Sequence, residues 1–121
     1  MQAVLDSNII IDALKGISQA HAEMEQYDVC IISIISWIEV MAGANTPQQK
    51  KLFKDFLRSF TLCSLDQEIA SRTVEIRSTR KHRLPDAIIL ATAEVNNCKL
   101  VTRNTKDFPK TDSRIRVPYT L

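Results

Sequence analysis

Residues 3–14 read AVLDSNIIIDAL and contain the pattern on which the fold prediction depends. Three apolar residues run up to Asp6, as expected of a short buried strand. Ser7 belongs to a residue type that caps helices, and the apolar run after it predicts a helix to Leu14 that Gly16 can end. A buried strand that turns directly into a helix is typical of α/β proteins.

The alternation of strands and helices continues along the chain. Val29-Cys30-Ile31-Ile32 is apolar throughout, which predicts a strand covered on both faces. Helix caps are predicted at Ser33 or Ser36, at Thr46 and at Asp66, and Pro85 is expected to open a further helix. Further strands are predicted at 60–63, 99–102 and 115–117, and further helices at 17–26, 46–58, 66–76 and 85–95. Because no linker or repeat interrupts this pattern, we expect one domain over residues 1–121 with a mostly parallel sheet.

Composition excludes several classes of protein. With 121 residues, 45% of them hydrophobic and 25% charged, the chain suits one compact domain and not a disordered segment. The longest apolar stretch, 29–38, is about half of the ~20 residues that a membrane helix needs. Residues 1–6 lack a basic region, so no signal peptide is expected and the cytoplasm is the predicted location. Cys30, Cys63 and Cys98 are predicted to be buried thiols of a reducing cytosol.

Charge is distributed unevenly along the sequence. Residues 1–46 carry one basic and six acidic side chains, whereas residues 47–121 carry fifteen basic and eight acidic ones. Opposite signs in the two parts are a weak indication of an anionic partner for the basic part. Uneven solvation of the surface explains the same numbers equally well.

Four acidic residues fall where predicted strands end or predicted helices begin. Asp6 ends the first strand, Glu39 lies about a turn into a helix, Asp86 lies in a first helical turn, and Asp107 follows the 99–102 strand. Singly, Asp6, Asp86 and Asp107 have ordinary explanations as turn, helix-dipole and loop residues. Glu39 is harder to explain, because it stands among apolar residues, where a carboxylate is costly to desolvate unless something pairs with it. In a parallel sheet, however, these segments meet at the carboxyl edge, where α/β proteins bind ligands.

Carboxylates gathered at one edge would repel each other, and a hard divalent cation would offset that repulsion. The only histidines are His21 and His82, so the sequence offers no zinc pattern. An all-oxygen site suits Mg²⁺ or Mn²⁺, and such sites hydrolyse phosphodiesters. The residues alone therefore favour a metal-dependent phosphodiesterase.

The segments that carry these acids resemble the motifs of PIN-domain nucleases, and most closely those of VapC-type toxins of toxin–antitoxin pairs. The matching segments are Val4-Leu5-Asp6-Ser7-Asn8-Ile9, the helix around Glu39, Leu84-Pro85-Asp86-Ala87-Ile88-Ile89 and Leu100-Val101-Thr102-Arg103-Asn104-Thr105-Lys106-Asp107-Phe108. They occur in the family's order and span residues 3–108. The resemblance implies a three-layer α/β/α sandwich, a Mg²⁺- or Mn²⁺-dependent ribonuclease activity on RNA, a homodimer and a cognate antitoxin. No membrane contact is expected.

The resemblance also implies roles for the acids. Asp6, Glu39 and Asp86 match the three main acidic ligands of the family, and Asp107 is expected as the fourth catalytic acid. We expect Asp6 and Asp86 to bind the ion directly. Glu39 and Asp107 would bind a second ion or orient the attacking water. Many relatives have Asp where Asn104 stands, so the fourth position is open between Asn104 and Asp107.

Four polar residues are expected to support the acids. Asn8 matches a residue that orients Asp6 or a metal-bound water, and Ser7 keeps the hydroxyl of the more usual Thr. Thr102 keeps a hydroxyl at the same edge. Asn104 would serve as a hydrogen-bond donor or a neutral ligand.

Basic residues beside these motifs are candidates for RNA phosphate contacts. They are Arg80, Lys81, Arg83 and Arg103, with pairing to a carboxylate as the alternative for Arg103 and a solvated helix end as the alternative for the others. His82 is expected to be exposed. The helices at 17–26 and 47–58 are candidates for a groove that takes an antitoxin helix.

Three functions remain open at this stage. The first is the ribonuclease toxin of a toxin–antitoxin pair, and the second is a PIN nuclease of RNA processing that has no antitoxin. The third is a PIN-like RNA-binding module that no longer cuts. Because Asp6, Glu39, Asp86 and Asp107 are all present, the sequence favours an enzyme.

Overall fold

The computed structural model describes residues 1–79 and 81–121, and its centre is a five-stranded sheet. The strands are β1 (Gln2–Leu5), β2 (Val29–Ser33), β3 (Thr61–Cys63), β4 (Lys99–Val101) and β5 (Ile115–Arg116). Their order is β3-β2-β1-β4-β5, and every neighbouring pair is parallel. The predicted parallel sheet is confirmed.

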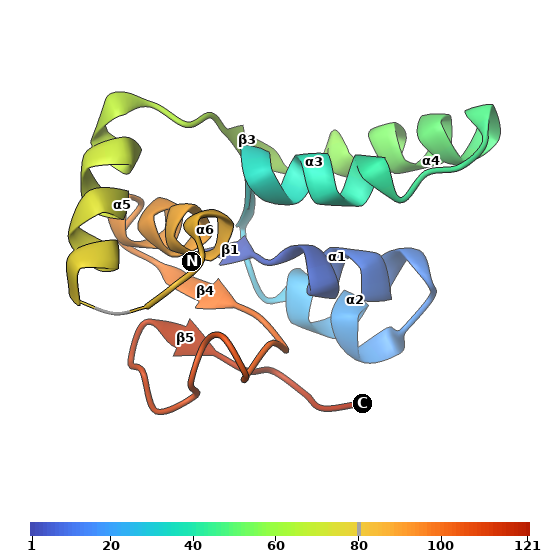
Figure 1. The fold of residues 1–121 in the computed structure, drawn as a ribbon. Coiled ribbons are helices and arrows are strands. Elements are labelled where there is room, and N and C mark those ends of the chain that lie inside the picture. Colours follow the sequence, from blue (N-terminus) through green and yellow to red (C-terminus); the bar gives the residue numbers. More distant parts are fainter. Residues whose placement is uncertain (80) are drawn as a thin grey trace.

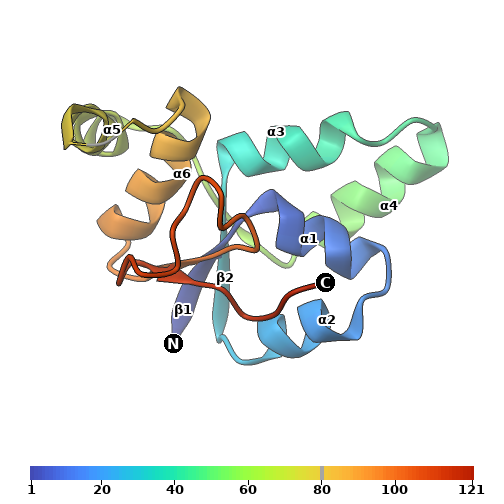
Figure 2. The ribbon, with the colours of Figure 1, turned by 60° about the horizontal axis from the view of Figure 1, so that its bottom comes forward.

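Helices cover both faces of the sheet, as Figures 1 and 2 show. In Figure 2, α5 and α6 lie to one side of β1 and β2, and the other four helices lie to the opposite side. The helices are α1 (Ser7–Leu14), α2 (Ser18–Glu25), α3 (Ile34–Ala42), α4 (Pro47–Leu57), α5 (Gln67–Thr79) and α6 (Leu84–Val95). This confirms the predicted three-layer α/β/α sandwich.

Alternation along β1 divides the core between these two layers. Val4 points into a cluster with Ile89 and Leu90 of α6. Leu5 points into a second cluster with Ile9 and Ile10 of α1. Successive strand residues face opposite sides of a sheet, so each face of β1 buries its own apolar set.

The helix caps agree with the predictions at three of four places. Ser33 caps α3 by accepting from Ile35 N, Thr46 caps α4 by accepting from Gln49 N, and Asp66 Oδ1 accepts from Ile69 N at the start of α5. The prediction of Ser7 as the cap of α1 is wrong. The cap is Asp6, whose carboxylate accepts from Ser7 N. The helix thus begins one residue earlier, and the cap is a candidate site residue.

Burial at the amino-terminal end of the sheet is lower than the sequence predicts. Val29 is 38% exposed, so β2 is covered on both faces only from Ile31 onward. Cys30, Cys63 and Cys98 are free, as predicted, but each is half-buried instead of buried. The helices that cover β2 pack over its carboxyl-terminal half, which leaves its first residues at the surface.

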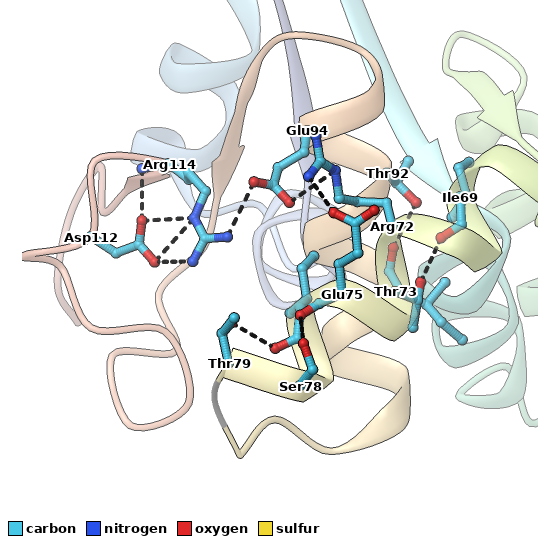
Figure 3. A network of polar contacts seen from close by, with 12 residues as sticks. Ile69, Arg72, Thr73, Glu75, Ser78, Thr79, Thr92, Glu94, Asp112 and Arg114 are labelled. Atoms are coloured by element: carbon cyan, nitrogen blue, oxygen red, sulfur yellow. Dashed lines mark hydrogen bonds and ion pairs between the residues drawn. The ribbon is translucent and has the colours of Figure 1, made fainter.

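Ion pairs join α5, α6 and the segment before β5 (Figure 3). Glu94 of α6 accepts from Arg114 at 3.2 Å and lies 3.7 Å from Arg72 of α5. Arg114 also donates to Asp112, and Arg72 to Glu75. This network links β5 to the α5–α6 layer.

In the part of the chain that the structure describes, no helix is both long and apolar enough to cross a membrane.

Candidate functional site

Asp6 lies where β1 ends, and its carboxylate is almost fully bonded. Asp6 as a whole is 5% exposed. Oδ1 accepts from Ser7 N at 2.8 Å, while Oδ2 accepts from Thr102 Oγ1 at 2.8 Å and from Asn8 Nδ2 at 3.3 Å. Burial raises the pKa of Asp6, and these hydrogen bonds oppose the rise. The side chain is therefore held in one orientation.

Thr102 connects the end of β4 to this carboxylate. Its hydroxyl donates to Asp6 and accepts from Asn8 Nδ2 at 3.1 Å and from Asn104 N at 3.0 Å. A hydroxyl has one hydrogen to donate and two lone pairs, so Thr102 uses its full capacity here. The parallel pairing of Leu5 with Val101 places these two strand ends side by side.

Asp86 stands in the first turn of α6. Its side chain is 16% exposed, and its buried Oδ2 has no hydrogen-bond partner among the described residues. Arg83 Nε lies 3.8 Å from that oxygen. Burial raises the pKa of Asp86, the charge of Asp107 adds to the rise, and Arg83 opposes it. A buried carboxylate oxygen without a donor is costly unless a ligand pairs with it.

Glu39 projects from α3 toward the same edge of the sheet. The residue is exposed, in contrast to the burial that its apolar sequence neighbours suggest. Partial burial of its carboxyl group raises its pKa, as do the charges of Asp6 and Asp86, while a hydrogen bond with Ser7 lowers it. The acids from β1, α3 and α6 therefore lie within electrostatic range of each other.

Asp107 is bonded within its own loop. Asn104 Nδ2 donates to its Oδ2 at 2.8 Å, and Asp107 N donates back to Asn104 Oδ1 at 3.2 Å. The Asn104 bond lowers the pKa of Asp107, and Arg83, with Nη2 at 3.4 Å, lowers it further. Asn104 thus acts toward Asp107 as the hydrogen-bond donor that the sequence allowed.

The four basic candidates differ in their surroundings. Arg83 bridges Asp86 and Asp107 with an exposed side chain, and Lys81 is exposed. Arg103 pairs with buried Asp12, which was the alternative considered for it. Arg80 lies outside the described residues.

Three residues near the site were missed or misjudged from the sequence. His82 was expected at the surface but is 9% exposed, with its ring 5.8 Å from that of Phe108. Within the described ranges, 1–79 and 81–121, its buried Nε2 has no hydrogen-bond partner. Asp12 and Tyr119 were not singled out, yet Asp12 accepts from the Arg103 guanidinium and the Tyr119 hydroxyl donates to Asp12. Asp12 lies one helical turn after Asn8, a spacing that could have drawn attention to it.

Divalent cations match the chemistry of this donor set. All of its side-chain ligands would be oxygens, and Asp86 offers an unpaired one. Among the residues described, no three His, Cys, Asp or Glu side chains lie close enough to share one ion. Mg²⁺ is usually held by one or two carboxylates and several waters, so Asp6 and Asp86 fit as its holders.

The comparisons with known proteins agree with this architecture. A toxin–antitoxin complex from Klebsiella pneumoniae contains a chain that is 40% identical, with a TM-score of 0.90 over 98% of this chain and 99% of that one. Ribonuclease VapC10 of Mycobacterium tuberculosis is 27% identical over 126 aligned positions, which cover 98% of this chain and 93% of that protein. FitAcB of Neisseria gonorrhoeae, at 22% identity, matches in fold with a TM-score of 0.80 over 98% of this chain and 99% of that one. The sequence profile of the PIN domain matches residues 3–113, and this chain belongs to the PIN domain family.

Proposed function

We propose that this protein is an endoribonuclease that hydrolyses RNA phosphodiester bonds with Mg²⁺ or Mn²⁺ and acts as the toxin of a type II toxin–antitoxin pair. The observation that carries the proposal is the site at the carboxyl edge of the sheet. There, Asp6, Glu39 and Asp86 come from three separate segments. The charges of Asp6 and Asp86 raise the pKa of Glu39, the charge of Asp6 also raises that of Asp86, and Asp86 keeps a buried oxygen to which no described residue donates a hydrogen bond. The ribonuclease and toxin–antitoxin relatives support the choice of RNA as substrate and of an antitoxin as partner.

The four acids divide into two pairs with different roles in this proposal. Asp6 and Asp86 would hold the cation, because Asp6 is fixed in orientation and Asp86 has a free oxygen. When bound, the ion would polarise a phosphoryl oxygen and offset the repulsion among the carboxylates. Glu39 and Asp107 would orient the attacking water or hold a second ion.

The reaction itself is a hydrolysis. The oxygen of the attacking water forms a bond to phosphorus, and the bond from phosphorus to the sugar O3′ breaks. One proton of the water passes to a carboxylate, and the leaving O3′ takes up a proton from solvent water to become the 3′-hydroxyl. Glu39 suits the proton because its pKa is raised, so it binds a proton more readily than an ordinary glutamate. The products would carry a 3′-hydroxyl and a 5′-phosphate.

Arg83 and Lys81 are the proposed phosphate contacts among the described basic residues. Arg83 is exposed and lies between Asp86 and Asp107, where it would meet the RNA backbone beside the site. Arg80 shares this proposed role from the sequence alone. Phosphate contacts position RNA without reading its bases, so these residues imply no sequence specificity.

Cleavage of a labelled RNA pool by protein free of antitoxin tests the proposal. We expect cutting with Mg²⁺ or Mn²⁺, none with EDTA, and a loss on the order of 10²–10³-fold or more in Asp6→Asn and Asp86→Asn. Asp55→Asn is the matched control, because Asp55 lies on α4, away from the site acids, and its carboxylate pairs with Arg58 at 3.7 Å. Products ending in 2′,3′-cyclic phosphate would contradict the hydrolytic route. Absence of both cutting and Mn²⁺ binding would favour an RNA-binding module.

The oligomeric state and the antitoxin partner of this protein are also proposed. We propose a homodimer of single-domain chains, residues 1–121, in the cytoplasm, inhibited by an antitoxin. A pocket beside α2 is lined by His21, Met24, Ser59 and Phe60 among others, and it supports α2 as one wall of the proposed antitoxin groove. Sedimentation of the chain alone tests the dimer. Co-purification with the product of a neighbouring small gene tests the antitoxin.

A further inference from the structure

Asp12 is a buried carboxylate close to the candidate site, and Arg103 and Tyr119 bind it from distant parts of the chain. The residue lies in α1 and is 3% exposed. Arg103 Nε donates to its Oδ2 at 2.6 Å and Nη2 to its Oδ1 at 2.9 Å. The Tyr119 hydroxyl donates to Oδ2 at 2.8 Å. Both oxygens of Asp12 are therefore bonded, and the guanidinium binds through its planar two-pronged edge.

The backbone of Arg103 also contacts the residue that supports Asp6. Arg103 N donates to Asn8 Oδ1 at 3.1 Å. Asn8 and Asp12 lie one turn apart on α1, so Arg103 binds the same helix face at two points. Because the carbonyl oxygen of Asn8 accepts this bond, its NH₂ group faces Asp6 Oδ2 and Thr102 Oγ1.

We propose that Asp12, Arg103 and Tyr119 form a positioning cluster, named here the Arg103 cluster, which fixes the amide of Asn8 and through it the carboxylate of Asp6. The proposal rests on the proposed function, since its consequence for activity requires that Asp6 take part in catalysis. It assigns Arg103 to the protein's own carboxylate and not to an RNA phosphate.

Two observations favour this assignment over an RNA contact. The Arg103 side chain is 30% exposed, and its charge is already paired with that of Asp12 at 2.6 Å. A phosphate would have to displace a buried carboxylate, which would then be left unpaired at high cost. By contrast, the side chain of Arg83 is 79% exposed and meets its two carboxylates only at 3.4 and 3.8 Å.

Tyr119 makes the C-terminal segment part of the cluster. Figure 2 shows this segment running beside α1 and α2. Tyr119 is partly buried against the core cluster that contains Leu5 and Ile9. Loss of its hydroxyl would free one side of Asp12 and allow Arg103 to move. The segment after β5 thereby influences a site at the other end of the sequence.

A second cluster provides a matched control. Glu23 of α2 is also 3% exposed, and it accepts from Arg116 Nε at 2.6 Å, from Arg116 Nη2 at 2.9 Å and from the Tyr27 hydroxyl at 2.6 Å. We name these three residues the Arg116 cluster. Among the described residues, none of its side chains bonds to Asp6, Asn8 or Thr102; its link to the site is the backbone bond from Thr102 N to Arg116 O.

The test compares Arg103→Lys and Tyr119→Phe with Arg116→Lys and Tyr27→Phe. Three quantities are measured: NMR signals of the Asn8 side-chain amide and of Arg103 N–H in metal-free protein, the affinity for Mn²⁺, and kcat and KM for RNA. Arg103→Lys is expected to shift the Asn8 signals and lower kcat and Mn²⁺ affinity about tenfold at unchanged KM. Tyr119→Phe is also expected to shift the Asn8 signals, and to lower kcat and Mn²⁺ affinity about threefold at unchanged KM. Neither control should change any of these quantities.

Three outcomes would overturn the proposal. A raised KM at unchanged kcat in Arg103→Lys would make Arg103 an RNA contact. Unmoved Asn8 signals in Arg103→Lys would show that the cluster does not position that amide. If Arg116→Lys and Tyr27→Phe changed the Asn8 signals, Mn²⁺ affinity and kcat as much as the Arg103 cluster variants do, both clusters would only stabilise the fold. If the wild-type protein neither binds Mn²⁺ nor cuts RNA, the proposed function fails, and the NMR comparison still decides whether the cluster positions Asn8.

Discussion

The Arg103 and Arg116 clusters have almost the same internal chemistry but different surroundings. Each contains a carboxylate that is 3% exposed, an arginine bonded through Nε and Nη2 at 2.6 and 2.9 Å, and a tyrosine hydroxyl. Each joins the α1–α2 layer to the chain after β4. Only in the Arg103 cluster does the arginine also hold Asn8, a neighbour of Asp6. The same interaction therefore serves stability in both places, and position alone brings one of the two arginines into contact with the Asn8 side chain.

Removing either arginine should produce the largest loss of stability. Arg103→Ala and Arg116→Ala each leave a buried carboxylate without its charge partner, so we expect each to lower the free energy of unfolding by about 3–5 kcal/mol. Urea denaturation followed by circular dichroism measures the change. A loss below about 1 kcal/mol in only one variant would show that the two clusters are not equivalent in stability.

Two buried threonines allow the site to be compared with the rest of the core. Thr102→Val removes the hydroxyl that donates to Asp6 and should weaken Mn²⁺ binding about 10–100-fold. Thr92→Val removes a hydroxyl that donates to Ile88 O within α6 and should leave Mn²⁺ binding unchanged. Calorimetric titration of both variants compares them. Equal weakening would mean that Thr102 has no special connection with the ion.

Acid should weaken both clusters in the same pH range. Hydrogen bonds from Arg103 and Tyr119 outweigh the effect of burial and lower the pKa of Asp12 below its ordinary 3.8, and the bonds from Arg116 lower that of Glu23 below 4.5. A folded-state pKa below the unfolded value stabilises the protein above the unfolded pKa, and this stabilisation is lost as pH falls through the folded pKa.

We therefore expect the free energy of unfolding to fall as pH drops below about 4. The fall should be shallower in Asp12→Asn and in Glu23→Gln. Denaturation curves at a series of pH values measure it. A fall of the same steepness in both variants and in the wild type would contradict the pairing as the cause.

Gly16 connects the two helices that carry the clusters, and its replacement should have the smallest effect. Its φ is +84°, and a Cβ there would meet nothing within 4 Å, so Gly16→Ala costs only backbone strain, about 1–2 kcal/mol. Gly43→Ala is the control, because Gly43 has a φ of −81°. Thermal unfolding measures both variants. The rate of RNA cleavage at 25 °C should stay unchanged in each.

The sequence predicted the parts of this protein that local patterns determine. The strand to Leu5, the helix after it and the acids at 6, 39 and 86 follow from apolar periodicity and from the rule that ligands bind at the carboxyl edge of a parallel sheet. The cap of α1 was misplaced by one residue because Asp6 and Ser7 are both good capping residues.

Contacts between residues far apart in the chain could not be predicted from the sequence. Asp12 and Arg103 are 91 positions apart, and nothing local distinguishes an arginine that meets a carboxylate from one that meets a phosphate. The burial of His82 likewise depends on its stacking against Phe108. That contact arises from the packing of the 104–108 loop against the chain before α6, which local propensity does not encode.

Titration of Mn²⁺ into metal-free protein, followed by electron paramagnetic resonance of the free ion, tests the claim that Asp6 and Asp86 hold a divalent cation at the carboxyl edge of the sheet. We predict saturable binding by the wild-type protein and by Asp55→Asn, and loss of that binding in both Asp6→Asn and Asp86→Asn. Equal binding by all four proteins, or none by the wild type, would contradict the claim.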